Sequence, residues 1–182
     1  MTLILGIDPS MRSLGWALGE PGSRPMTGVE ELGGAGEREV RVWRNGIVWL
    51  STFLSQHHPE VVAIEAPIMT SAPKDGEKGI SNPRTIMVLN GVNAMLRTIT
   101  FMKTGREASV IYPSSARKAL TGKGRFDKGR AKPEVKAACV ALGWANQDDP
   151  FDVTDALAIW AAAAVHEDQN FAANFTPLVR AS

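Results

Sequence analysis

Two short apolar runs in this sequence end directly at an acidic residue, and this arrangement constrains the fold more than any other feature. The run Leu-Ile-Leu-Gly-Ile leads into Asp8, and the run Val-Val-Ala-Ile leads into Glu65. Short apolar runs bounded by turn residues are typical of buried strands. A further pair of acids, Asp152 and Asp155, stands at the start of an alanine-rich segment with helical character. Three distant segments therefore each place acids at the end of a predicted core element.

The remaining pattern predicts a strand hairpin followed by strands that alternate with helices. Strands are expected over residues 3–8, 13–18, 27–32, 61–65 and 109–112. Helices are expected over about 37–56, 82–102, 133–142 and 153–166, with a further helical turn beginning at Pro113. This order is typical of an α/β fold in which a mixed sheet is covered by helices on both faces.

The length of 182 residues indicates one domain, expected over residues 1–170, with an irregular tail over 171–182. Hydrophobic residues make up 44% of the chain, which is enough for a sizeable core. Cys139 is the one cysteine, so neither an intramolecular disulfide nor a cysteine zinc site can form, which favours a reducing compartment such as the cytoplasm. We expect no signal peptide, because residues 1–8 offer neither a basic leader nor a cleavage site. We expect no contact with a membrane, because no apolar run approaches the roughly 18 residues that span a bilayer.

Charge is distributed unevenly along the chain. Residues 97–136 carry eleven Lys and Arg against three acids, whereas residues 146–182 carry six acids and one base, Arg180. A basic stretch beside an acidic one suits a polyanion docked next to a metal site. A solvated basic face explains the charge equally well.

The acids have ordinary explanations when each is taken alone. Asp152 and Asp155 complement the dipole at a helix N-terminus, and an acid at a strand end can be an exposed edge residue. Taken together they point to a metal, because gathered carboxylates repel one another unless a cation neutralises them. Oxygen ligands of this kind suit Mg²⁺ or Mn²⁺, and a pair of such ions can activate water and stabilise a leaving oxygen at phosphorus.

Four motifs resemble, in order, those of the RuvC-type Holliday junction resolvases, and they cover the chain from residue 3 to about 165. They are Gly-Ile-Asp-Pro-Ser at 6–10 followed by Gly15-Trp16, Val-Ala-Ile-Glu at 62–65, the basic stretch 117–128 with its Gly-Lys-Gly, and Asp-Val-Thr-Asp-Ala-Leu-Ala-Ile at 152–159. Each motif alone is weak, and their combination is specific.

The resemblance implies an RNase H-like fold with a five-stranded mixed sheet, and it implies that Asp8, Glu65, Asp152 and Asp155 are the catalytic, metal-binding acids. It implies a homodimer that cuts two opposed strands of a four-way DNA junction symmetrically. The expected cofactor is Mg²⁺, with Mn²⁺ as a substitute and two ions in each active site. The products carry 5′-phosphate and 3′-hydroxyl ends. The host would be a bacterium or a phage-infected cell.

Several basic residues match the lysine-bearing loop of the same family. Lys118 and Lys128 resemble its functional lysines, and Lys128 is expected to offset charge in the transition state. The residues expected to bind DNA are Arg117, Lys118, Lys123, Arg125 and Lys128.

The loop over residues 66–83 departs from the family, whose corresponding segment carries an aromatic residue that stacks on junction bases. Ile68, Met69 or Phe126 can take that wedge role, although packing explains each of them too. The departure fits a divergent or phage-type member.

Three readings of function remain to be weighed. The first is a structure-selective endonuclease that resolves four-way junctions. The second is a related RNase H-like nuclease acting on other branched DNA or on RNA, and the third is a junction-binding protein that has lost catalysis. The helix over 82–96 is a candidate dimer contact, although packing on the sheet explains it equally well.

Overall fold

A five-stranded mixed sheet forms the centre of the molecule in a computed structural model, which describes residues 2–67 and 83–175. The strands are β1 (Ile4–Pro9), β2 (Ser13–Gly19), β3 (Met26–Glu31), β4 (Val61–Glu65) and β5 (Ser109–Ile111). Their order is β3-β2-β1-β4-β5. The hairpin strands β1, β2 and β3 pair antiparallel, whereas β4 and β5 run parallel to β1. The predicted mixed sheet is confirmed.

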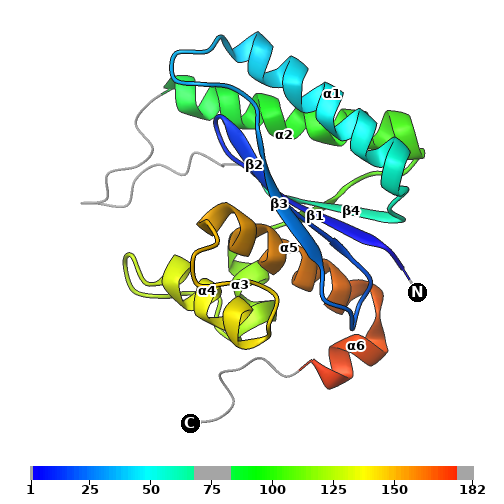
Figure 1. The fold of residues 1–182 in the computed structure, drawn as a ribbon, viewed down its shortest axis with the longest axis vertical. Coiled ribbons are helices and arrows are strands. Elements are labelled where there is room, and N and C mark those ends of the chain that lie inside the picture. The colour runs from blue at the N-terminus through cyan, green and yellow to red at the C-terminus, as the bar shows by residue number, and fades with distance from the viewer. Residues whose placement is uncertain (1, 68–82, 176–182) are drawn as a thin grey trace.

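Helices cover both faces of this sheet, as predicted (Figure 1). The upper layer in Figure 1 contains α1 (Glu39–His57) and α2 (Pro83–Thr104). The lower layer contains α3 (Pro113–Thr121), α4 (Ala131–Ala141) and α5 (Phe151–Glu167). Each layer has its own core, because the two sides of the strands face different helices.

The alanine-rich helix α5 lies closest to the sheet. Ten of its seventeen residues are buried, and the Trp160 indole donates a hydrogen bond to the Gly19 carbonyl at 3.1 Å. A Cβ atom on Gly6 would lie 2.7 Å from the Trp160 backbone nitrogen, so glycine is required where β1 meets α5. The small side chains of α5 therefore bring its backbone onto β1 and β2.

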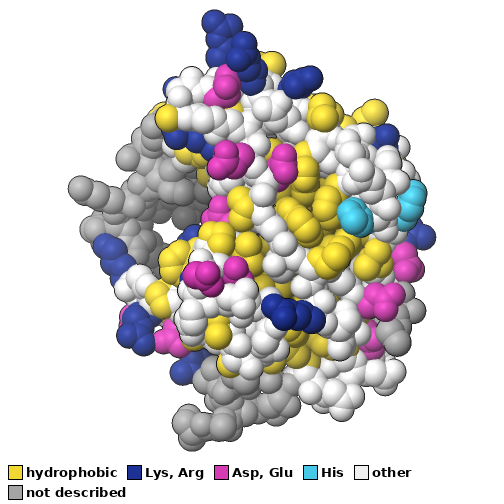
Figure 2. Space-filling model, in the orientation of Figure 1, with side chains coloured by type: hydrophobic (Ala, Val, Ile, Leu, Met, Phe, Trp, Pro, Cys, Tyr) yellow, Lys and Arg dark blue, Asp and Glu magenta, His cyan; other side chains and the backbone are white. Residues whose placement is uncertain are grey.

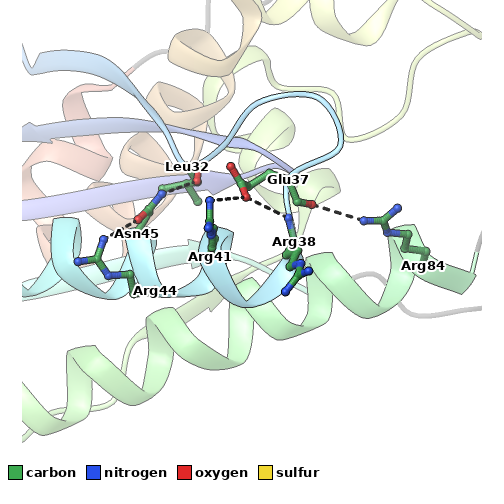
Figure 3. Close-up of polar contacts among 7 residues, drawn as sticks. All are labelled: Leu32, Glu37, Arg38, Arg41, Arg44, Asn45 and Arg84. Atoms are coloured by element: carbon green, nitrogen blue, oxygen red, sulfur yellow. Dashed lines mark hydrogen bonds and ion pairs between the residues drawn. The ribbon is translucent and has the colours of Figure 1, made fainter.

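The connection between β3 and α1 is held by side chains, although its glycines predict flexibility. Figure 3 shows Asn45 donating to the Leu32 carbonyl at 2.9 Å and Arg41 paired with Glu37 at 3.5 Å. Arg84 extends from the start of α2 to the Glu37 carbonyl. These contacts tie the beginnings of α1 and α2 to the end of the hairpin.

The chain beyond α5 differs from the expected irregular tail at its start. A short helix, α6 (Gln169–Asn174), begins with Asp168 accepting from two backbone amides. Phe171 stacks on Phe175 and contacts Trp160 edge-on, so aromatic packing orders this turn. Residues 176–182 lie outside the described part of the chain.

Within the described residues, no helix is both long and apolar enough to cross a membrane.

Candidate active site

Asp8 and Glu65 leave the sheet side by side. β1 and β4 are parallel neighbours in which Ile7 pairs with Ile64, so the next residue of each strand emerges at the same edge. The Asn93 amide, buried in α2, donates to the Glu65 carbonyl at 2.6 Å and fixes the end of β4. The Asp8 and Glu65 carboxyl groups are hydrogen-bonded to each other.

The second pair of acids comes from the first turns of α5. A Cβ atom on Gly15 would lie 1.9 Å from the Asp152 carbonyl oxygen, so the missing side chain lets the start of α5 rest on β2. Ser13 donates from its hydroxyl to Asp152 Oδ2 at 3.0 Å. Asp155, three residues further on, lies on the same helix face as Asp152.

All four predicted acids line one pocket of 570 Å³. The strand acids Asp8 and Glu65 meet the helix acids Asp152 and Asp155 there, where the ends of β1 and β4 approach α5. Acids separated by as many as 147 positions in the sequence therefore converge, which is what the motif pattern predicts.

The electrostatics of this pocket disfavour bare carboxylates. Burial is the largest cause that raises the pKa of Asp8 well above its ordinary value, and the charges of Glu65 and Asp155 raise it further. Burial also raises the pKa of Glu65, although its hydrogen bond from Asp8 opposes the rise. Burial and neighbouring charge thus disfavour the charged form of Asp8 more strongly than that of Glu65.

Three basic residues line the same pocket: Arg12, Arg117 and Lys132. Lys132 makes an ion pair with Asp155, at 3.0 Å from Nζ to Oδ2. Burial opposes the charge of this ammonium, but the hydrogen bond to Asp155 and the charges of Asp155, Asp8 and Asp152 give a net rise in its pKa. The pocket thus already contains positive charge opposite its acids.

The other predicted cations lie elsewhere. Lys118 is exposed on α3, and Lys128 is exposed in the turn before α4; neither lines the pocket of acids. Lys123 and Arg125 line a second pocket of 740 Å³ beside α4. Of the five basic residues expected to contact DNA, Arg117 is therefore the one placed among the acids.

Sequence reasoning missed Lys132 because it predicted that the helix begins at residue 133, which assigned this lysine to the loop. The helix α4 begins at Ala131 instead. Lys132, Val135 and Cys139 then follow at helical spacing, and the last two are buried. Two inward residues placed three and seven positions after a lysine are the signal that could have identified it.

Of the three residues expected to wedge between junction bases, the described part of the chain includes one. Phe126 is half-buried and lines the second pocket with Lys123 and Arg125. Ile68 and Met69 lie outside the described residues. Their predicted role stays a prediction.

The donor set matches a hard divalent cation in type, because four carboxylates face one pocket and the buried Asp8 resists ionisation without a cation. The spacing of these acids in the described arrangement does not match that of a metal centre. Among residues 2–67 and 83–175, no three His, Cys, Asp or Glu side chains are gathered closely enough to hold a metal ion. In this arrangement Lys132 forms an ion pair with Asp155, and Ser13 donates a hydrogen bond to Asp152.

The sheet order and the two helical layers define an RNase H-like fold. T. thermophilus RuvC, solved in complex with a Holliday junction substrate, superposes with a TM-score of 0.70 at 19% identity, over 94% of this chain and 98% of that one. This likeness concerns the fold.

Sequence comparison identifies a particular family within this fold. The sequence model of the family described as "Crossover junction endodeoxyribonuclease RuvC" matches residues 4–166, so this chain belongs to the RuvC family. A relative of that name from Streptomyces coelicolor is 30% identical, with 95% of this chain and 89% of the relative covered. Another, from Nitratiruptor sp., is 28% identical over 86% of this chain and 91% of its own.

Proposed function

We propose that this protein is a metal-dependent endonuclease that resolves four-way DNA junctions by cutting two opposed strands symmetrically. The observation that carries the proposal is the convergence of four acids and three basic residues on one pocket. The RuvC family to which the chain belongs is a family of metal-dependent nucleases. Hydrolysis at phosphorus would leave 5′-phosphate and 3′-hydroxyl ends.

Asp8, Glu65, Asp152 and Asp155 would hold the metal. Their oxygen donors suit Mg²⁺, with Mn²⁺ as a substitute, and we propose two ions in each active site. When bound, the metal supplies an activated water and neutralises the leaving oxygen. The chain's own part is to keep the strand acids fixed through the sheet and the helix acids fixed through Ser13 and Gly15.

Arg117 and Lys132 are the residues that we propose to face the scissile phosphate. Negative charge builds up on the phosphoryl oxygens as the bond to the leaving oxygen breaks, and a positive side chain held nearby stabilises it. From sequence, Lys128 was expected to offset charge in the transition state. We now propose that Lys132, which lines the pocket, has this role.

We propose that the basic residues outside the pocket bind the DNA backbone. Lys118, Lys123, Arg125 and Lys128 surround the α3–α4 connection. In Figure 2, Lys and Arg side chains gather at the left margin of the molecule, on the side where this connection lies in Figure 1. Such contacts give affinity that depends on salt and not on sequence.

A homodimer follows from the symmetry of the substrate, and we propose α2 as its contact. Met87, Ala94 and Phe101 are exposed on this helix and follow at seven-residue spacing, so they form one stripe. Phe101→Glu is expected to give a monomer by sedimentation, whereas Lys103→Glu, beside the stripe, leaves the dimer intact. A monomeric wild-type protein would contradict this part of the proposal.

We further propose that residues 1–170 act as one nuclease domain. We also propose that the protein works in the cytoplasm, which would contain its DNA substrate and keep the Cys139 thiol reduced.

The experiment that tests the function compares a synthetic four-way junction with a replication fork, a linear duplex and an RNA of equal length, each with Mg²⁺ and with EDTA. We expect paired nicks at symmetry-related positions, on the junction alone and with Mg²⁺ alone. Comparable cutting of forks or RNA would favour the broader nuclease. Junction binding without cutting, unchanged in Asp8→Asn, would favour a non-catalytic binding protein.

A further inference from the structure

Lys132 lies inside the pocket of acids as the partner of Asp155. The two side chains come from the first turns of α4 and α5, and their atoms Nζ and Oδ2 lie 3.0 Å apart. The lysine side chain is 53% exposed and the aspartate side chain 22%. The ammonium therefore approaches the acids from the solvent side of the pocket, where a cation entering from solution would also arrive.

A second contact helps to hold the ammonium there. Lys132 Nζ lies 5.7 Å from the centre of the Phe151 ring, within the range of a cation–π interaction. Phe151 is the first residue of α5 and directly precedes Asp152. Lys136 Nζ lies 5.4 Å from the same ring but donates to the Asp149 carbonyl instead of to an acid of the pocket. The two lysines thus share one ring and differ in whether they engage the cluster.

The ion pair engages one of the acid oxygens of the pocket. An oxygen of Asp155 that a metal would need is bonded to Lys132, and an oxygen of Asp152 accepts from Ser13. The four acids share a pocket, yet no three of them, nor any other described His, Cys, Asp or Glu, are close enough for a metal centre. In the described arrangement, Lys132 places positive charge directly against Asp155.

We propose that Lys132 is a built-in counter-ion that competes with a divalent cation for Asp155, and that cation binding frees its ammonium to turn toward the scissile phosphate. This inference rests on the proposed function and extends it, because one lysine then serves two states of the site. In the metal-free protein it reduces repulsion among the acids. In the loaded protein it becomes available to the phosphoryl oxygens.

Metal affinity in the absence of DNA tests the competition directly. Mn²⁺ binding is measured by calorimetry or electron paramagnetic resonance for the wild type, Lys132→Gln, Lys132→Arg and the matched control Lys136→Gln. Removing the competing charge is expected to tighten Mn²⁺ binding about fivefold, which corresponds to about 1 kcal/mol. Lys132→Arg and Lys136→Gln are expected to bind as the wild type does. Unchanged or weaker binding by a folded Lys132→Gln would overturn the inference.

A second measurement uses the unmodified protein and needs no variant to fold. An amine-reactive reagent is applied with and without saturating Mn²⁺, and modification of each lysine is followed by mass spectrometry. We expect Mn²⁺ to increase the reactivity of Lys132 and to leave that of Lys136 unchanged. Equal reactivity of Lys132 in both states would show that the ammonium stays on Asp155.

These results are separable from the test of function. Failure of the competition would leave junction cleavage with Mg²⁺ untouched. Absence of cleavage would refute the nuclease without changing how Lys132 responds to Mn²⁺. The two roles also predict opposite signs in one variant, because Lys132→Gln should bind Mn²⁺ more tightly and yet cut more slowly.

Discussion

The carboxyl groups of Asp8 and Glu65 are hydrogen-bonded to each other across two parallel strands that end at the same edge of the sheet. Burial first, and then the charges of Glu65 and Asp155, raise the pKa of Asp8 well above its ordinary value of 3.8. A buried acid with a raised pKa makes the folded protein less stable at neutral pH than a neutral side chain of the same shape would. The two acids at the strand ends thus lower the free energy of unfolding of the protein when no cation neutralises them.

Asp8→Asn is therefore expected to stabilise the metal-free protein while it abolishes cleavage. The amide keeps the shape and can still donate to Glu65, but it never carries the charge that burial penalises. With EDTA at pH 8, we expect its melting temperature to rise by about 3 °C. Junction cleavage is expected to fall by a factor of about 10³.

The pH dependence gives the control for this prediction. The penalty on Asp8 is fully present above its raised folded-state pKa and vanishes below the ordinary value of 3.8. The advantage of Asp8→Asn should thus shrink as the pH falls. A variant that melts below the wild type at pH 8 would show that the charge is not penalised.

Cleavage by Lys132→Ala and Lys128→Ala separates the two candidates for the lysine that acts at the phosphate. Only Lys132 lines the pocket of acids, so its loss is expected to lower the cleavage rate of bound junctions by a factor of about 10². Lys128→Ala should cut bound junctions at the wild-type rate and bind them more weakly. Single-turnover assays at saturating enzyme make the comparison, and the reverse order would restore the assignment made from sequence.

Much of the fold and the acid cluster could be predicted because local patterns determine them. Apolar runs that end at Asp8 and Glu65 fix strand ends, and parallel pairing then brings those ends together. Asp152 and Asp155 are three residues apart at a helix start, which settles their common face. That the helix acids meet the strand acids depends on how α5 packs on the sheet, and this part was implied by the resemblance to the RuvC family.

The basic residues could not be predicted in the same way. Which of several lysines reaches the acids depends on where α4 begins and how it leans on α5, and helix starts are the least certain part of a sequence reading. A difference of two residues in that start separates a loop position for Lys132 from one in the pocket. The contact between Phe171 and Trp160 is likewise tertiary, whereas the cap of α6 at Asp168 is a local signal that the sequence analysis did not use.

Gly15→Ala tests whether the close approach of β2 and α5 positions Asp152. The added Cβ would lie 1.9 Å from the Asp152 carbonyl oxygen, so the helix start must move or the fold must loosen. We expect a loss of about 3 kcal/mol in the free energy of unfolding by urea denaturation, together with a loss of cleavage.

Gly34→Ala is the matched control for that substitution. Nothing lies within 4 Å of the position of its Cβ atom, so we expect a change within about 0.5 kcal/mol and normal cleavage. Equal stability of the two alanine variants would mean that the contact at Gly15 does not hold α5 in place.

Loss of Lys123 or Arg125 is expected to act on affinity alone. Each should remove about one phosphate contact and reduce the slope of log affinity against log salt by about 1. Junction binding is measured in EDTA, where no cleavage is expected, over a series of salt concentrations. Glu20→Gln, distant in the β2–β3 connection, serves as a control that keeps the slope. An unchanged slope for both basic variants would remove this loop from the DNA interface.

Whether the four acids hold the metal is tested by the position of Mn²⁺ in a crystal of the protein with an uncleaved junction, located by anomalous scattering. We expect metal in the pocket of acids, with oxygens of Asp8 and Asp155 at about 2.2 Å and Lys132 Nζ no longer bonded to Asp155. Mn²⁺ bound away from these carboxylates, or a pocket in which the junction lies against the acids without metal, would contradict this expectation.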